Sequence, residues 1–166
     1  NGQGTSSIDI TNMNGGGSLE IWCKITDTTA YRHIGGWRGN DYMFYMLLLY
    51  SNGSMEARAR DGSSNIDIVS SDYGTSFWAN NWNHIVLTDS GSDNKTRFYL
   101  NGSLTGTSSS TVGNYSSYSS FELMKTGSFN SGITAGKLSQ VRLYSDTLSD
   151  SEVKHNYDVM KGRFGL

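Results

Sequence analysis

Apolar and polar residues alternate with a period of two through the segment from Trp82 to Gly102. The apolar positions before and after the polar run SGSDN are Ile85, Leu87, Phe98 and Leu100. A period of two is typical of β-strands, because successive side chains point to opposite faces of a sheet. Asn101-Gly102 then predicts a tight turn. The segment is therefore predicted to form two antiparallel strands, which need further strands packed on them to be stable.

The same alternation predicts strands along most of the chain. The further predicted strands are 6–10, 18–25, 31–37, 42–50, 55–60, 66–69, 103–107, 121–125 and 136–144. The segment 18–25 is the clearest, because every second residue from Leu19 to Ile25 is apolar. The segment 42–50 is apolar on both faces, as expected for a strand in the middle of a sandwich. The Ser-, Thr- and Tyr-rich segment 108–120 is either a surface loop or a weak strand.

One helix interrupts this pattern near the C-terminus. Ser149 and Glu152 have the spacing of a capping box, in which each side chain bonds the backbone N–H of the other residue. Apolar residues then recur at helical spacing, and Gly162 is the expected stop. The predicted fold class is therefore all-β: a two-sheet antiparallel β-sandwich, or jelly roll, with one short C-terminal helix near 149–161. A chain of 166 residues has the size of one domain, so residues 1–166 are predicted to form a single domain.

Composition and charge argue against two classes of partner. The net charge is −2 and the isoelectric point is near 5.9, so the chain lacks the basic character of a nucleic-acid-binding protein. No apolar run approaches the roughly 18 residues of a membrane-spanning helix. Cys23 is the only cysteine, so it forms no internal disulfide and is predicted to be a small core residue. Because the chain begins at Asn1 without an initiator methionine, we expect that it was processed or belongs to a longer precursor.

Three motifs stand in a fixed order along the chain. They are S-L-E-I-W-C-K over residues 18–24, W-x-H-I-V-L-T followed by R-F-Y-L-N-G over residues 82–102, and G-K-L-S-Q-V-R-L-Y-S-D-T-L-S-D-S-E-V over residues 136–153. Together they resemble the laminin-G-like, concanavalin A-like jelly-roll domains, which implies one laminin-G-like jelly roll over the chain. Ser139-Gln140 stand where that family commonly has an aspartate, so no calcium role is carried over to this position.

The C-terminal segment 156–166 reads N-Y-D-V-M-K-G-R-F-G-L. It is similar to the end of such domains in virion structural proteins of tailed phages. The resemblance implies an extracellular or virion-surface location. The partners that it implies are surface glycans, neighbouring subunits of a larger assembly, or both.

The glutamates do not form the pair that a sugar hydrolase needs. Glycosidases of this superfamily carry carboxylates on one strand as E-x-D-x-x-E, because one acid protonates the leaving oxygen and another attacks the sugar. The four glutamates are Glu20, Glu56, Glu122 and Glu152, and none has a carboxylate two residues away in a predicted strand. The three histidines lie in different elements, without the spacing of a zinc site. The chain is therefore predicted not to be an enzyme.

Two predicted loops combine aromatic rings with polar side chains, as a glycan site requires. The candidate glycan-binding residues are Trp37, Arg38, Asp41 and Tyr42 in the first loop, and Trp78, Asn80 and Asn81 in the second. The alternative is that the two tryptophans are buried anchors of their loops. For calcium, which prefers carboxylate and carbonyl oxygens, the candidates are Asp89, Asp93 and Asn94. The alternative is that these three residues only form a turn.

Three functions are compatible with these observations, in order of preference. The first is a non-catalytic structural or adhesion module on a virion, as a phage capsid decoration or tail appendage, or on another extracellular assembly, where it binds glycans or holds subunits together. The second is a secreted carbohydrate-binding, lectin-like domain that uses calcium. The third is a β-glucan hydrolase, and the missing carboxylate pair argues against it. No cofactor other than calcium is indicated.

Overall fold

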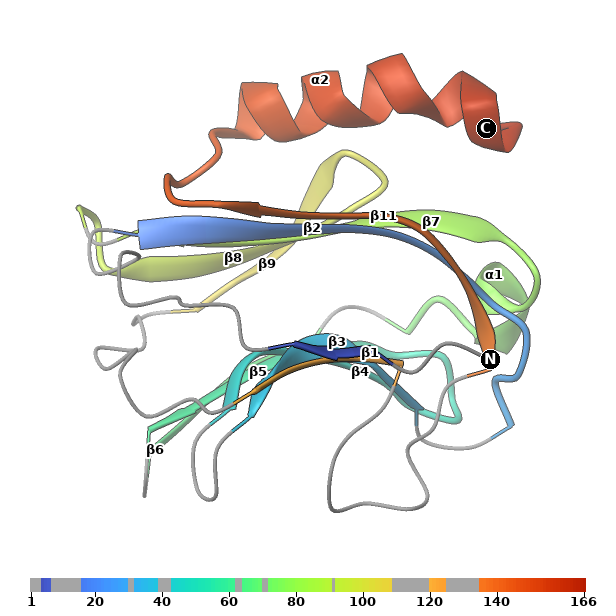
Figure 1. The fold of residues 1–166 in the computed structure, drawn as a ribbon, viewed down its shortest axis with the longest axis horizontal. Coiled ribbons are helices and arrows are strands. Elements are labelled where there is room, and N and C mark those ends of the chain that lie inside the picture. The colour runs from blue at the N-terminus through green and yellow to red at the C-terminus, as the bar shows by residue number, and fades with distance from the viewer. Residues whose placement is uncertain are drawn as a thin grey trace.

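Two antiparallel sheets face each other in the computed structural model of the chain (Figure 1). The structure describes residues 4–6, 16–29, 32–38, 43–61, 64–69, 72–90, 92–108, 120–124 and 135–166. Strands dominate these ranges, so the predicted all-β sandwich with a C-terminal helix is confirmed. None of the described helices is long and apolar enough to cross a membrane.

Within the described residues, the first sheet has six strands. In spatial order they are β1 (Gly4–Ser6), β10 (Ser120–Leu123), β3 (Arg32–Arg38), β4 (Met43–Leu49), β5 (Met55–Asp61) and β6 (Ser64–Val69). The predicted strand with apolar residues on both faces is β4, and it lies between β3 and β5 as expected. The predicted strand 6–10 meets the described residues only at Ser6, and the segment 108–120 lies outside them except at its two ends.

The second sheet, over the same described ranges, has five strands. In spatial order they are β11 (Gly136–Tyr144), β2 (Gly16–Ile25), β7 (Trp82–Ser90), β8 (Lys95–Leu100) and β9 (Ser103–Thr107). The predicted pair within residues 82–102 is confirmed as β7 and β8, with Leu87 opposite Phe98. Asn101 and Gly102, at φ 49° and 78°, form the tight turn from β8 to β9. Positive φ at both positions is the conformation that an Asn-Gly pair adopts most easily.

The core lies between the two sheets and is built from the alternating apolar positions. Leu19, Ile21 and Leu87 point inward from β2 and β7 and are fully buried. Burial of one such side chain contributes about 1.5–3 kcal/mol to folding. Cys23 lies on the same face, as predicted, and burial raises the pKa of its thiol to about 12. The thiol therefore keeps its proton at neutral pH.

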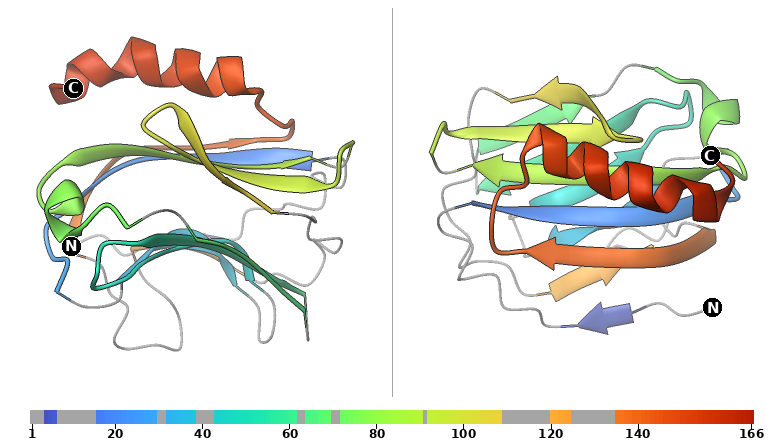
Figure 2. Two further views of the ribbon diagram at one scale, coloured as in Figure 1. Left: turned by 180° about the vertical axis from the view of Figure 1, so that it is seen from behind. Right: turned by 90° about the horizontal axis from the view of Figure 1, so that it is seen from above.

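Helix α2 (Asp150–Lys161) lies across the outer face of the five-stranded sheet, and a short 3-10 helix, η2 (Gly162–Phe164), follows it (Figure 2). The predicted capping box is present. Ser149 N–H donates to Glu152 Oε2 at 2.8 Å, and Glu152 N–H donates to Ser149 Oγ at 3.3 Å. Val153 is fully buried and packs on Val86 and Tyr99. The sheet face that α2 covers is thus a second, smaller apolar interface.

Aromatic rings stack beneath α2 and η2. The centroid of the Trp22 ring lies 4.3 Å from that of Phe164, 4.8 Å from that of His84 and 5.9 Å from that of Tyr157. Trp22 and His84 are fully buried, as predicted for structural side chains. The helix buries them, because the even-numbered residues of β2 and β7 point away from the core. Trp82, also expected in the core, is half-buried, with its ring 4.8 Å from Phe164.

Candidate functional site

A depression of about 630 Å³ lies where the turn between β7 and β8 meets the start of α2. Ser90 lines it from the end of β7, Ser92 from the turn, Arg97 and Tyr99 from β8, and residues 147–151 from the segment that leads into α2. Most of these side chains carry hydroxyl groups. The others are the guanidinium of Arg97, the carboxylate of Asp150 and the side chain of Leu148. Such a lining offers many hydrogen bonds and little apolar surface.

The register of β7 and β8 places the strand residues of the depression on the outer face of the sheet. Leu87 and Phe98 point into the core, so their neighbours Thr88 and Arg97, which pair across the two strands, point outward. Asn94, at φ 57°, allows the tight turn that joins the strands. The pleat and this turn therefore bring Arg97 beside the end of β7.

Arg97 is held by Asp93 from the same turn. Its Nη2 contacts Asp93 Oδ2, and its Nη1 lies 3.4 Å from Asp93 Oδ1. The hydrogen bond from Arg97 lowers the pKa of Asp93, and the same bond raises the pKa of Arg97. The one guanidinium among the lining residues is therefore already paired with a carboxylate.

Tyr99 fixes the carboxylate of the depression. Its hydroxyl donates to Asp150 Oδ1 at 2.7 Å, from β8 to the first turn of α2. Burial raises the pKa of Tyr99, the bond to Asp150 raises it further, and the Thr88 side chain partly opposes this rise. The hydroxyl therefore keeps its proton and donates at every physiological pH. The Tyr99 side chain is 1% exposed, so it offers no ring face to a ligand.

Three hydrogen bonds fasten the segment that leads into α2. Ser18 Oγ donates to the Asp146 carbonyl at 3.0 Å and accepts from Leu148 N–H at 2.8 Å. Thr147 Oγ1 donates to the Asp89 carbonyl at 2.5 Å. One wall of the depression is thus tied to β2 and β7, and the depression is formed before any ligand arrives.

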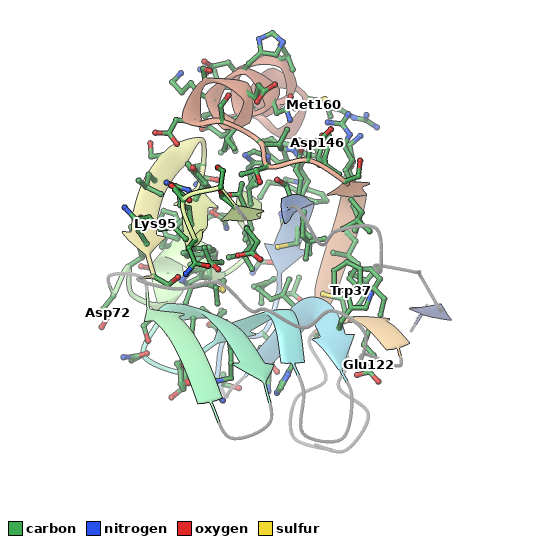
Figure 3. The ribbon with its side chains drawn as sticks, turned by 90° about the vertical axis from the view of Figure 1, so that its left-hand side faces the viewer. Trp37, Asp72, Lys95, Glu122, Asp146 and Met160 are labelled. Carbon is green, nitrogen blue, oxygen red and sulfur yellow. The ribbon has the colours of Figure 1, made fainter. Side chains whose placement is uncertain are left out.

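Trp37 and Trp78, two of the candidate glycan-binding residues, lie in the core, as the alternative of buried loop anchors predicted. Trp37 is 1% exposed, lies between the sheets (Figure 3), and has its ring centroid 4.4 Å from that of Phe121. Trp78 ends the short helix α1 (Thr75–Trp78), is fully buried, and donates from Nε1 to the Gly53 carbonyl at 2.7 Å. Both rings are the buried anchors of the alternative interpretation, because the strand ends and α1 fold inward over the core.

None of the other predicted glycan residues that the structure describes lines the depression. Arg38 ends β3, and Asp41 and Tyr42 lie outside the described residues. Asn80 is exposed in a turn at φ 62°, and Asn81 Nδ2 donates to the Ser76 and Phe77 carbonyls, both at 3.0 Å, at the end of α1. These two residues precede β7, whereas the depression lies at the other end of that strand, beside the turn to β8.

The predicted calcium ligands do not converge. Asp89 is fully buried and accepts from Thr96 Oγ1 at 2.7 Å, on the face that carries Leu87. Asp93 instead pairs with Arg97 on the outer face. Among the described residues, no group of three or more His, Cys, Asp or Glu side chains gathers as a metal site would. These residues therefore do not fit a calcium site between them.

A second polar cluster surrounds Glu20, which is fully buried beneath α2. Its Oε2 accepts from the Tyr144 hydroxyl at 2.7 Å and from Asn156 Nδ2 at 2.9 Å. Its Oε1 accepts from Arg142 Nη1 at 3.2 Å, and His84 Nε2 lies 3.3 Å away without hydrogen-bond alignment. Burial alone raises the pKa of Glu20, but its contacts with His84, Tyr144 and Arg142 outweigh burial and lower it. Glu20 and His84 are fully buried whereas the Arg142 side chain is 37% exposed, so the cluster reaches the surface only at its edge and ties β2 and β11 to the helix.

Sequence reasoning missed both polar clusters. Tyr99 and Asp150 are 51 positions apart, and the partners of Glu20 on β11 and α2 are 122 to 136 positions away. The sequence signals that could have pointed to these clusters were Glu20, at an outward strand position, and Asp150, in the first turn of the predicted helix. Neither signal identifies its partner, because the partner is set by which strands become neighbours.

Comparison with families of known proteins matches residues 1–154 to the Laminin_G_3 family, described as the concanavalin A-like lectin/glucanases superfamily. Among solved structures, the CBM40 module of the Ruminococcus gnavus IT-sialidase has a TM-score of 0.71 at 18% identity, covering 88% of this chain and 84% of that chain. No curated protein matches the chain.

Two further structures have the same fold. The binding domain of botulinum neurotoxin serotype D has a TM-score of 0.71 at 15% identity, covering 92% of this chain and 39% of that chain. The native heptameric SAP-like pentraxin of Limulus polyphemus has a TM-score of 0.62 at 19% identity, covering 84% of this chain and 68% of that chain. The fold and the family match over residues 1–154 agree, and the chain belongs to the concanavalin A-like lectin/glucanases superfamily.

Proposed function

We propose that the chain is a non-catalytic glycan-binding module whose ligand site is the depression at the start of α2. The observation that carries this proposal is a preformed, hydroxyl-rich lining that also holds a fixed carboxylate and a fixed guanidinium. Sugars are recognised by few well-placed polar groups in a concave site. The CBM40 module was solved bound to α2,3-sialyllactose, and the binding domain of botulinum neurotoxin DC in complex with SialylT, which supports a glycan as the ligand class.

The placement of the glutamates supports a binding role over hydrolysis. Glu20 is buried beneath α2, and Glu152 is engaged in the capping box. Glu122 lies on the outer side of the six-stranded sheet (Figure 3), and the strand register places Glu56 on the same side. Their strands are three spacings apart, about 14 Å, whereas glycosidase carboxyl groups lie roughly 5–9.5 Å apart. These four side chains therefore make no catalytic pair.

Asp93, the carboxylate that pairs with Arg97 beside the depression, lacks the property of a general acid. A glycosidase acid needs a raised pKa so that it is protonated when it meets the substrate. The hydrogen bond from Arg97 instead lowers the pKa of Asp93, and Asp150 serves as the acceptor of the Tyr99 hydroxyl. Such carboxylates are suited to accept hydrogen bonds from the hydroxyl groups of a sugar.

We further infer that the module acts on the surface of a virion or of another extracellular assembly, where it binds glycans or contacts neighbouring subunits. The similarity of residues 156–166 to the end of virion structural domains supports this location. Light scattering of the purified chain tests the subunit role. A chain that stays monomeric at every concentration would contradict self-assembly and leave glycan binding as the role.

A broad glycan array tests the binding role directly. We expect the wild-type chain to bind a defined group of glycans, and a double Arg97→Ala, Asp150→Ala variant to lose at least tenfold in affinity. The matched control is Asp158→Asn, which removes a charge from the same helix outside the depression and is expected to bind as the wild type does. A chelator added to the array tests the calcium alternative. The absence of any glycan binding would contradict the proposed function.

A further inference from the structure

The one cation among the residues that line the depression is already paired, and the exposed Lys95, opposite Ser90 on the same face of β8, lies outside that lining. Arg97 is the one cationic side chain among its lining residues, and both of its Nη atoms face the Asp93 carboxylate. An acidic sugar that reached Arg97 would have to displace Asp93 and would meet its negative charge. Like charges at contact distance repel more strongly beside protein than in bulk water.

The start of α2 does not favour the binding of an anion either. The first turn of a helix attracts negative charge because its N–H groups lack partners. Here the capping box fills that role, with the Glu152 carboxylate accepting from Ser149 N–H and the Ser149 hydroxyl accepting from Glu152 N–H. Asp150 adds a second carboxylate to the same turn. A carboxylate on a ligand would therefore meet two fixed negative charges there.

The same geometry suits the hydroxyl groups of an uncharged sugar. The Tyr99 hydroxyl occupies one lone pair of Asp150 Oδ1, and no second hydrogen bond holds this carboxylate among the described residues. An ionised carboxylate only accepts hydrogen bonds, and bonds to an ionised group are stronger than neutral ones. Oδ2 and the second lone pair of Oδ1 are thus placed to accept from two adjacent hydroxyls. The flanking serine hydroxyls of Ser90, Ser92 and Ser151 can donate or accept.

A buried hydroxyl lies beside that of Tyr99, behind the depression. Thr88 is fully buried, and its side chain faces the Tyr99 hydroxyl without a well-aligned hydrogen bond in the part of the chain that the structure describes. It pairs with Ser18 on one side and Arg97 on the other, on the sheet face that carries Ser90 and Tyr99. Thr88 does not line the depression, so it acts on the site only through Tyr99.

We infer that the depression selects uncharged glycans with adjacent hydroxyl groups. Asp150 accepts those hydroxyls, Tyr99 positions Asp150, and Asp93 holds Arg97 away from acidic sugars. This inference rests on the proposed function, and it separates the ligand of this chain from the sialylated ligands of its structural neighbours.

Matched pairs of glycans test the inference. An array carries neutral glycans such as lactose next to their acidic counterparts such as α2,3-sialyllactose, and the affinity for each member is measured by titration. We expect the wild-type chain to bind neutral members at least tenfold more tightly than their acidic counterparts. Asp150→Asn keeps the acceptor for Tyr99 but loses the charge, so its affinity for neutral members should fall about tenfold. Asp158→Asn is the control and should change neither affinity.

Asp93→Asn distinguishes a role of Asp93 in ligand selection from a purely structural role. It removes the charge that pairs with Arg97, so we expect the affinity for acidic members to rise severalfold while neutral binding changes little. Tyr99→Phe keeps the buried ring and should weaken neutral binding severalfold. If Tyr99→Phe fails to fold, as judged by circular dichroism, Thr88→Val tests the site through Tyr99 instead and should preserve the fold.

Three results would overturn the inference in distinguishable ways. Tighter binding of acidic members by the wild-type chain would contradict the ligand class and leave glycan binding intact. Neutral binding that Asp150→Asn leaves unchanged would contradict the site. No binding to either member of any pair would contradict the proposed function itself.

Discussion

The carboxylate of Glu20 accepts a hydrogen bond from Asn156 Nδ2 at 2.9 Å, so a fully buried charge on strand β2 is tied to helix α2. Tyr144 and Arg142 of β11 satisfy the remaining oxygen positions of the same carboxylate. A buried carboxylate is tolerated only when it is paired and hydrogen-bonded. The charge on Glu20 and the position of α2 therefore depend on each other, and this relationship can be tested by mutation.

Glu20→Ala is expected to destabilise the chain by about 3–5 kcal/mol. The change removes the acceptor of the hydrogen bonds from Tyr144, Asn156 and Arg142, and it leaves the Arg142 guanidinium without its counter-charge. Urea unfolding followed by tryptophan fluorescence measures the free energy of unfolding. Asp158→Asn, which removes only half-exposed ion pairs with Lys154 and Lys161, is the control and should cost less than about 1 kcal/mol. A loss below about 1 kcal/mol would contradict the anchoring role of Glu20.

Stability is expected to fall in acid. The pKa of Glu20 in the folded chain lies below its ordinary value of 4.5, so the folded state binds fewer protons than the unfolded state near that pH. Its contribution is therefore complete above pH 4.5 and is lost as the pH falls through the folded-state pKa. The backbone and side-chain hydrogen bonds of Thr29 and the contact with Arg32 hold the pKa of Asp27 near 2, which adds to the loss in the same direction. Urea midpoints between pH 7 and pH 2 measure the decline, and a midpoint that rises in acid would contradict it.

Gly53→Ala is expected to destabilise far more than Gly74→Ala. Both glycines have positive φ, at 92° and 71°, and Gly74 has ψ 156°, so alanine costs about 1–3 kcal/mol in backbone strain at either position. At Gly53 the new Cβ would also lie 2.3 Å from the Gly74 carbonyl carbon, whereas at Gly74 it would meet open space. Thermal unfolding of the two variants compares the costs. If the two variants lose equal stability, the turn at Gly53 moves away from Gly74 and makes room for the new Cβ.

Ser149→Ala is expected to cost about 1 kcal/mol of stability. The change removes the Oγ that accepts from Glu152 N–H, so one backbone donor at the start of α2 loses its partner. Ser151→Ala is the matched control, because Ser151 lies in the same turn and caps no backbone group among the described residues. The difference between the two variants in urea measures the cap. Equal losses would contradict its contribution.

The elements that follow local patterns were predictable. The period-two alternation of residues 82–102 predicted β7 and β8, and the Ser149–Glu152 spacing predicted the start of α2. The family resemblance over residues 18–24, 82–102 and 136–153 agrees with the match over residues 1–154. Such patterns are readable because a strand pleat and a helical turn involve only residues a few positions apart.

Burial and pairing were decided by the tertiary structure. Trp37 and Trp78 stand at the end of a strand and in a four-residue helix, where no sequence period distinguishes an inward ring from an exposed one. The depression required Tyr99 and Asp150 to meet across 51 positions, after β8 and α2 had packed on the same sheet face. The sequence by itself therefore determined the strands, the helix and the family. The packing of the sheets and α2 alone decided which polar side chains share a site, because those contacts join residues that no local pattern relates.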